Sequence, residues 1–198
     1  LEDVPSLLTP ETDGDLLLDS FLRLGYCQRM MGSLSEAEAT YAAAGKIAKR
    51  RKETARALRA QIGNALVVMV RGNLPRAEEL LAEVIDASAR THCVDVTSNA
   101  LHVRSAVAQR RGDMGRAVCL AYEALQCTAL PNDRDAILGD IGAYFIVMER
   151  FDAARDALMV LEATAATELY RLNARANMVI LGARAGDKEI FETWRSRI

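Results

Sequence analysis

The sequence predicts an all-α solenoid, in which helical hairpins stack side by side, and three observations support this. Glycines recur forty residues apart, each after an apolar helical run, and a small residue follows each glycine by five positions. No segment alternates apolar and polar residues over the length that a half-buried strand needs. A repeat of this period is typical of solenoids, whose units bury their apolar faces only against their neighbours. The repeated positions are Gly32, Gly72 and Gly112 with Ala37, Ala77 and Ala117, and the frame continues at Glu149 and Gly186.

The elements follow from turn and capping signals along the chain. Residues 1–12, with Pro5 and Pro10, are expected to be an irregular lead-in, and a repeat domain is expected over 13–198. Five hairpins are expected over 13–52, 54–91, 95–128, 132–166 and 168–198, the last of them incomplete. Helices are expected over about 13–31, 33–52, 54–71, 96–111, 113–128, 134–148, 152–165 and 168–185, with further helices after Asn73 and Asp187.

Specific residues are expected to start these helices. Two pairs, a hydroxyl residue followed three positions later by an acid, have the spacing of capping boxes. Pro75 falls in a first turn, where a missing N–H does no harm. Thr12 with Asp15 and Ser33 with Glu36 are the boxes, Asn73 and Asp113 are further caps, and Pro131, Asn132 and Asp133 are expected to form an inter-repeat turn.

The composition excludes several classes of protein. Apolar residues make up 51% and charged residues 26%, and the formal net charge is −2. This balance gives no general attraction to nucleic acid or anionic lipid. No apolar run reaches the roughly 18 residues of a membrane span, and the N-terminus lacks the plan of a signal peptide. We expect a cytoplasmic protein, and the chain is expected to be a piece of a longer one.

The four cysteines show no C-x-x-C spacing, so neither a metal site nor a disulfide framework is expected. We expect them to be small, buried apolar residues of helices. They are Cys27, Cys93, Cys119 and Cys127.

The hairpins resemble tetratricopeptide repeats over nearly the whole chain. That family places a small residue midway along the first helix. In the second helix it places a small one early, a large one four positions later, and a small or apolar one three beyond. Small side chains at these points let helices pack closely. The four sets are Gly25, Ala37, Tyr41 and Ala44; Ala65, Ala77, Leu81 and Val84; Ser105, Ala117, Ala121 and Ala124; and Gly142, Ala154, Leu158 and Leu161.

The resemblance implies a right-handed solenoid of about five antiparallel hairpins. The family's first-position Trp and closing Pro are mostly missing, and Phe191 stands where the fifth repeat should have a small residue. Units of 37 to 40 residues are longer than the usual ones, as in repeats of bacterial regulatory proteins, including transcriptional activators.

The resemblance also implies a concave groove lined by the first helix of each hairpin, in which a peptide or protein segment lies. Asparagine amides in such a groove pair with backbone groups, and arginines clamp carboxylates. The alternative is an unused, solvated polar face. The predicted groove residues are Tyr26, Arg29, Arg59, Asn99, His102, Gln109, Asp140, Asn173, Asn177 and Arg184.

Three other features have two interpretations each. Seven basic residues lie between Lys46 and Arg59, and only Glu53 opposes their charge. They either bind phosphates or an acidic partner, or form a solvated helix end. The solvated helix end is the favoured interpretation. Asp140 is either a paired structural residue or a groove acid. Several apolar residues either make core contacts or form an apolar floor of the groove: Leu66, Met69, Val70, Ile146 and Val147.

The sequence therefore predicts a non-catalytic interaction module without cofactor or metal. The two histidines, His92 and His102, have no acidic partner at ligand spacing, and no catalytic motif occurs. Partners are expected to be proteins or peptides, not membrane or nucleic acid. One alternative is a ligand-sensing regulatory domain of a larger bacterial transcriptional regulator. Another is self-assembly through end hairpins.

Overall fold

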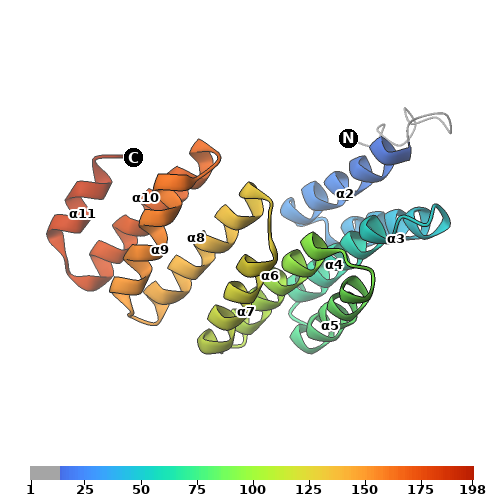
Figure 1. Cartoon of the computed structure of the whole chain (residues 1–198), viewed down its shortest axis with the longest axis horizontal. Coiled ribbons are helices and arrows are strands. Elements are labelled where there is room, and N and C mark those ends of the chain that lie inside the picture. Colours follow the sequence, from blue (N-terminus) through green and yellow to red (C-terminus); the bar gives the residue numbers. More distant parts are fainter. Residues whose placement is uncertain (1–13) are drawn as a thin grey trace. The chain divides into compact units, whose positions relative to one another are not determined.

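A computed structural model describes residues 14–198, with side chains from residue 16 onward. This part of the chain forms ten helices and contains no strand, which confirms the all-α prediction (Figure 1). The expected lead-in over residues 1–12, and the Thr12–Asp15 capping box, lie outside the described residues.

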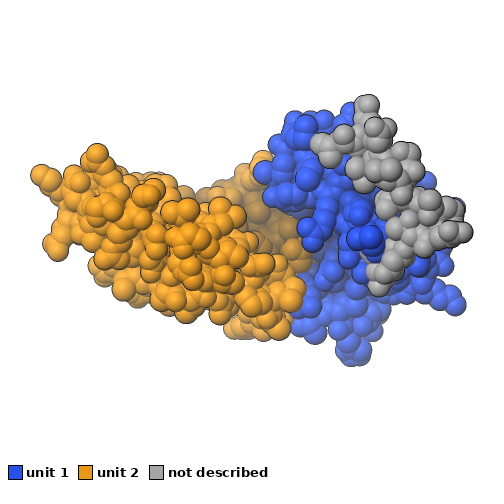
Figure 2. Space-filling model, turned by 90° about the horizontal axis from the view of Figure 1, so that it is seen from above, with its two compact units in different colours: residues 1–96 blue, residues 97–198 orange. Residues whose placement is uncertain are grey.

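The chain divides into two compact units, Leu1–Val96 and Thr97–Ile198 (Figure 2). In the first unit, α2 (Gly14–Met30), α3 (Leu34–Arg50), α4 (Thr54–Val70) and α5 (Leu74–Arg90) each pack against the next helix. Helix α2 also contacts α4, so the first helices of successive hairpins touch.

The second unit begins within α6 (Val94–Arg110) and repeats this plan. It contains α7 (Met114–Cys127), α8 (Pro131–Val147), α9 (Phe151–Thr164), α10 (Glu168–Ala185) and α11 (Lys188–Arg195). Helices α7 to α11 pack in sequence, and α8 also contacts α10. In both units, therefore, a hairpin buries its apolar face against neighbouring hairpins, as a solenoid requires.

The residues that carry the family resemblance form the core. All four second-helix sets, from Ala37, Tyr41 and Ala44 to Ala154, Leu158 and Leu161, are buried. Their first-helix counterparts Gly25 and Gly142 are buried as well. A Cβ atom on Gly142 would lie 2.6 Å from Leu158, so a larger residue there would clash with the crossing helix.

The turns repeat more often than the glycines indicate. At the end of α2, Gly32 has a φ of 82°, and the N–H of Ser33 donates to the carbonyl of Gln28, five residues back. This is the Schellman arrangement that satisfies the last carbonyls of a helix. Left-handed residues follow every 20 positions at Gly32, Lys52, Gly72, His92 and Gly112, so the repeating unit of these turns is one helix with its turn.

His92 holds a left-handed conformation, with a φ of 55°, that glycine adopts without strain. We expect His92→Gly to raise the free energy of unfolding by about 1 kcal/mol, because a side chain in this conformation costs roughly 1–2 kcal/mol. Urea unfolding followed by circular dichroism measures the change. Gly72→Ala is the reverse control and should lower stability, because no atom lies within 4 Å of the added Cβ and only the conformation changes. A less stable His92→Gly variant would contradict this account.

Two local predictions need correction. Ser33 precedes α3 but its side chain makes no capping hydrogen bond, whereas Asn73 and Asp113 accept from backbone N–H groups as expected. Residues at these positions have ψ values of 62° to 75°, not extended values, and the longer Asn and Asp side chains reach the N–H where serine does not. The other correction concerns Pro131, Asn132 and Asp133, which form the first turn of α8 and not the turn before it. The fixed φ and missing N–H of Pro131 suit a first helical position.

Candidate functional site: a polar strip on α6, α8 and α10

Two predicted groove residues in the second unit form a direct pair. His102 on α6 and Asp140 on α8 place Nε2 and Oδ2 2.8 Å apart. A carboxylate is only an acceptor, so His102 Nε2 carries the hydrogen and donates. The His102 side chain is 19% exposed and that of Asp140 is 48% exposed, so solvent reaches the pair. Asp140 is thus both a paired residue and an accessible acid.

A buried hydroxyl pair fixes the backbone beneath His102. The hydroxyl of Ser105 donates to the His102 carbonyl at 2.7 Å, so the hydroxyl of Tyr144, 3.1 Å from Ser105, must donate to Ser105. Burial raises the pKa of Tyr144 to about 12, the charge of Asp140 adds to this, and the bond with Ser105 opposes it. Tyr144 is therefore a neutral donor at physiological pH, and it ties α8 to α6.

Two asparagines continue the polar surface on α10. The side-chain amide of Asn177 donates to Oδ1 of Asn173 at 3.0 Å and to the Asn173 carbonyl at 3.1 Å. Gly139 of α8 makes room for Asn173, since a Cβ atom on Gly139 would lie 3.0 Å from its Oδ1. Asn173 therefore lies against α8, one residue along that helix from Asp140. We name His102, Asp140, Asn173 and Asn177 the polar strip.

The polar strip offers both donors and acceptors. Within the described residues, the Asn173 amide nitrogen and the Asn177 amide oxygen have no hydrogen-bond partner. A free donor and a free acceptor on adjacent side chains complement the C=O and N–H groups of an extended peptide. The second oxygen of Asp140 adds an acceptor.

The other predicted residues of this unit are accessible but separate from the polar strip. Asn99 and Gln109 are half-buried on α6, and neither has a recorded polar contact with a strip residue. Arg184, in the last turn of α10, is exposed and lies 3.9 Å from Glu149. The structure thus forms two pairs from the seven groove residues predicted for this unit, His102 with Asp140 and Asn173 with Asn177.

The three predicted residues of the first unit do not form one cluster. The guanidinium of Arg29 lies 5.4 Å from the centre of the Tyr26 ring, and both are on α2. Arg59 is exposed on α4 and lines a separate open pocket of about 240 Å³ with His92 and Asp95. A single groove through both sets of residues stays a prediction.

The outward apolar residues divide between the two interpretations. Met69 and Ile146 are buried, and Ile146 belongs to a core cluster with Leu158 and Met178. Val70 and Val147 are 38% and 43% exposed. Leu66 is half-buried. Val70, Val147 and part of Leu66 are therefore accessible to a ligand.

The basic run contains ion pairs that the sequence does not show. Arg51 and Arg56 both pair with Glu53, and Arg56 also reaches Asp19 of α2 at 3.0 Å. The hydrogen bond from Arg56 holds the pKa of Asp19 below its ordinary value. This part of the run links α2 to α4 and is structural.

The prediction that the cysteines are buried is wrong. Cys27 and Cys119 are exposed, and Cys93 and Cys127 are half-buried. The outward faces of Cys27 on α2 and Cys119 on α7 leave room for any polar or small residue, so burial is not what places cysteine there. In residues 14–198 no three His, Cys, Asp or Glu side chains gather as metal ligands do. The helices described also include none with the length and hydropathy of a membrane span.

The fold is similar to solved structures of helical-repeat proteins. TPR-like repeats of a P. anserina protein assigned as a kinesin light chain match with a TM-score of 0.68, over 90% of this chain and 93% of that chain, at 19% identity. Apo RapI matches with a TM-score of 0.71, over 98% and 72% of the two chains, at 13% identity. YrrB, a TPR protein with an unusual peptide-binding site, matches at 0.54, over 88% and 80%, at 14% identity.

No protein-family model matches this chain, and no curated protein matches its sequence. The structural likeness nevertheless confirms the expected fold class, a TPR-like helical solenoid.

Proposed function

We propose that this chain is a non-catalytic interaction module that holds an extended segment of a peptide or protein against the polar strip. The observation that carries the proposal is two polar pairs on three first helices, His102 with Asp140 and Asn173 with Asn177, with Asn173 packed against Gly139, the neighbour of Asp140 in the chain. These side chains are accessible, and each is held by a neighbour or by helix packing. A preformed surface of this kind loses little conformational entropy on binding.

The chemistry of the polar strip suits a peptide backbone. Asparagine supplies one donor and one acceptor at a fixed separation, and the backbone offers the complementary pair at every residue. The peptide-binding site named for YrrB, on a similar fold, adds support. Exposed Val147 on α8 supplies an apolar contact for the same ligand.

The His–Asp pair does not form a hydrolytic site with the nearby serine. A serine nucleophile needs its hydroxyl within reach of the histidine ring and open to substrate. Ser105 is instead fully buried, and its hydroxyl donates to the His102 backbone carbonyl. The pair is better suited to orienting a ligand. No observation favours the ligand-sensing regulatory alternative.

Peptide-library selection against the protein, followed by titration of the selected peptides, tests the proposal. We expect Asn173→Ala/Asn177→Ala to weaken the peptides about tenfold or more, because two hydrogen bonds of roughly 1 kcal/mol each are lost. Gln126→Ala/Asn132→Ala removes the same two amides from exposed positions outside the strip and should change affinity less than twofold. Selected peptides that bind the two double variants equally well would rule out the polar strip as their site.

A further inference from the structure

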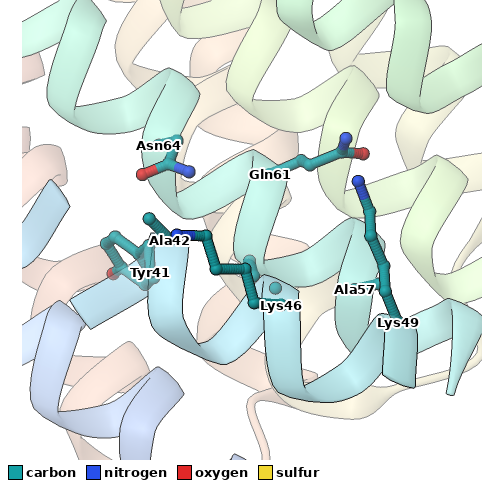
Figure 3. A pocket seen from close by; sticks show the side chains of 9 residues that line it. Tyr41, Ala42, Lys46, Lys49, Ala57, Gln61 and Asn64 are labelled. Carbon is teal, nitrogen blue, oxygen red and sulfur yellow. The ribbon is translucent and has the colours of Figure 1, made fainter. Parts of the chain in front are cut away.

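A second candidate site lies in the first unit, on a surface that the proposed function does not use. An open pocket of about 190 Å³ lies between α3 and α4 (Figure 3). It is lined at intervals of three and four residues along both helices, from Ala42 to Lys49 and from Ala57 to Asn64, which is one face of each. On α4 this face is opposite to that of Arg59, the groove residue predicted there, because helical positions recur every 3.6 residues.

Small residues create the hollow. A Cβ atom on Gly45 would lie 3.6 Å from the Cβ of Ala60, so α3 and α4 approach closely at this point. Ala42 and Ala57 line the pocket as well, while Lys46, Lys49, Gln61 and Asn64 are its longer side chains. The pocket therefore has a shallow apolar floor and polar walls.

The charge of the walls has one sign. Lys46 and Lys49 extend from α3 along the pocket in Figure 3, and no acidic residue lines it among those described. No ion pair is recorded for either lysine in this part of the chain, whereas Arg51 and Arg56 of the same basic run pair with Glu53. Two ammonium groups over a hollow surface without a counter-charge attract an anion.

Asn64 adds an independent observation. Its Oδ1 is buried and has no hydrogen-bond partner, while in Figure 3 its amide nitrogen is directed away from Tyr41, toward Gln61. A buried acceptor without a donor destabilises a fold, so packing alone favours an apolar residue here. Local departures of this kind concentrate at functional sites. The amide nitrogen is a donor on the same wall as the Gln61 amide.

We propose that this pocket binds a phosphate group, as the free ion or as a monoester of a small molecule. A phosphate carries close to two negative charges at neutral pH and matches the two ammonium groups. Its oxygens accept from Lys46, Lys49 and the amide nitrogens of Asn64 and Gln61. A single carboxylate has half this charge and leaves one lysine without a counter-ion.

Calorimetric titration with inorganic phosphate, at constant ionic strength, tests the site on the full chain. Lys46→Gln/Lys49→Gln should weaken binding at least tenfold. Arg50→Gln/Lys52→Gln removes the same charge from the same basic run but outside the pocket, and should stay within twofold of the parent. Equal losses in the two variants would mean general electrostatic attraction and would overturn the site, as would the absence of saturable binding in the parent.

Asn64→Leu separates a ligand-binding role from a structural one. It should weaken phosphate binding severalfold while thermal stability stays equal or rises, since the unpaired oxygen is removed. Lower stability with unchanged binding would contradict the role given to Asn64. Glycerol phosphate, titrated in parallel, distinguishes the sources: tighter binding than inorganic phosphate indicates a monoester ligand, and equal binding indicates the free ion.

Discussion

Asp135→Ala is expected to lower the free energy of unfolding by about 3 kcal/mol, since it removes a buried carboxylate and leaves the donors that it accepts from without a partner. The Asp135 side chain is completely buried on α8. Its Oδ2 accepts from the N–H of Ala166 at 2.6 Å, and its Oδ1 lies 2.9 Å from the guanidinium of Arg134. That guanidinium also donates to the carbonyl of Thr164 at 2.8 Å. The two side chains together hold the turn between α9 and α10.

Urea unfolding of matched variants checks this expectation. Asp152→Ala also removes a carboxylate paired with an arginine, Arg155, but that carboxylate is 92% exposed and should matter by less than about 0.5 kcal/mol. Asp135→Asn keeps the size of the side chain and one acceptor oxygen but turns an N–H₂ group toward donors. It should therefore lower the free energy of unfolding by about 2 kcal/mol. A loss for Asp135→Ala no larger than that for Asp152→Ala would show that the turn is held by other contacts.

Asp135 also shows why some residues cannot be found from the sequence. It stands at the start of an apolar helix, where an acid is expected to face solvent or the positive helix end. Its backbone partner lies 31 residues away in a turn between other helices. The local sequence pattern around Asp135 gives no indication of this contact with the N–H of Ala166.

The pairs across adjacent hairpins are different, because the repeat length predicts them. His102 with Asp140, Ser105 with Tyr144 and Arg56 with Asp19 are separated by 38, 39 and 37 residues. Each separation is close to one repeat of 37 to 40 residues, which returns the chain to the equivalent position on the next first helix. Searching for complementary polar residues at this spacing finds the His102–Asp140 pair. Testing each histidine only against acids at metal-ligand spacing misses it.

The small residues of the core were predictable for the same reason. Where two helices cross closely, each repeat needs a small side chain at the equivalent position. These small residues therefore recur with the period of the repeat and can be found in the sequence. The pocket between α3 and α4 was not predictable, because it depends on which way the lysines of a basic run point. Periodicity gives the face of a helix, but the opposing helix decides whether that face is hollow.

Gly63→Ala has the second large expected effect. It should lower the free energy of unfolding by about 2 kcal/mol, because the added methyl group overpacks the core. The ring of Tyr41 is 4% exposed and lies between Gly25 of α2 and Gly63 of α4. A Cβ atom on Gly25 would lie 2.8 Å from this ring, and one on Gly63 would overlap it further. Because Gly25 lies against the ring as well, α4 must shift or the ring must leave its rotamer.

The matched control is Gly45→Ala on α3, which faces only an ordinary contact with Ala60. There the same change should raise stability by up to about 1 kcal/mol, because alanine favours a helix over glycine. Thermal unfolding of both variants, with opposite signs expected, checks the crowding argument. A gain in both would mean that Gly63 is not confined by the ring.

Replacing Tyr41 identifies the atoms responsible. In the Gly63→Ala background, Tyr41→Leu removes the ring. The double variant should then be more stable, by at least about 1 kcal/mol in the free energy of unfolding, than the sum of the two single effects predicts. Tyr41→Phe removes only the hydroxyl and should recover nothing, since the overlapping atoms are ring carbons. Recovery by Tyr41→Phe would instead assign the effect to the polar surroundings of the hydroxyl, where burial raises the pKa of Tyr41 and Arg29 opposes the change. The close approach of α2 and α4 would then depend on that hydroxyl and not on the two glycines.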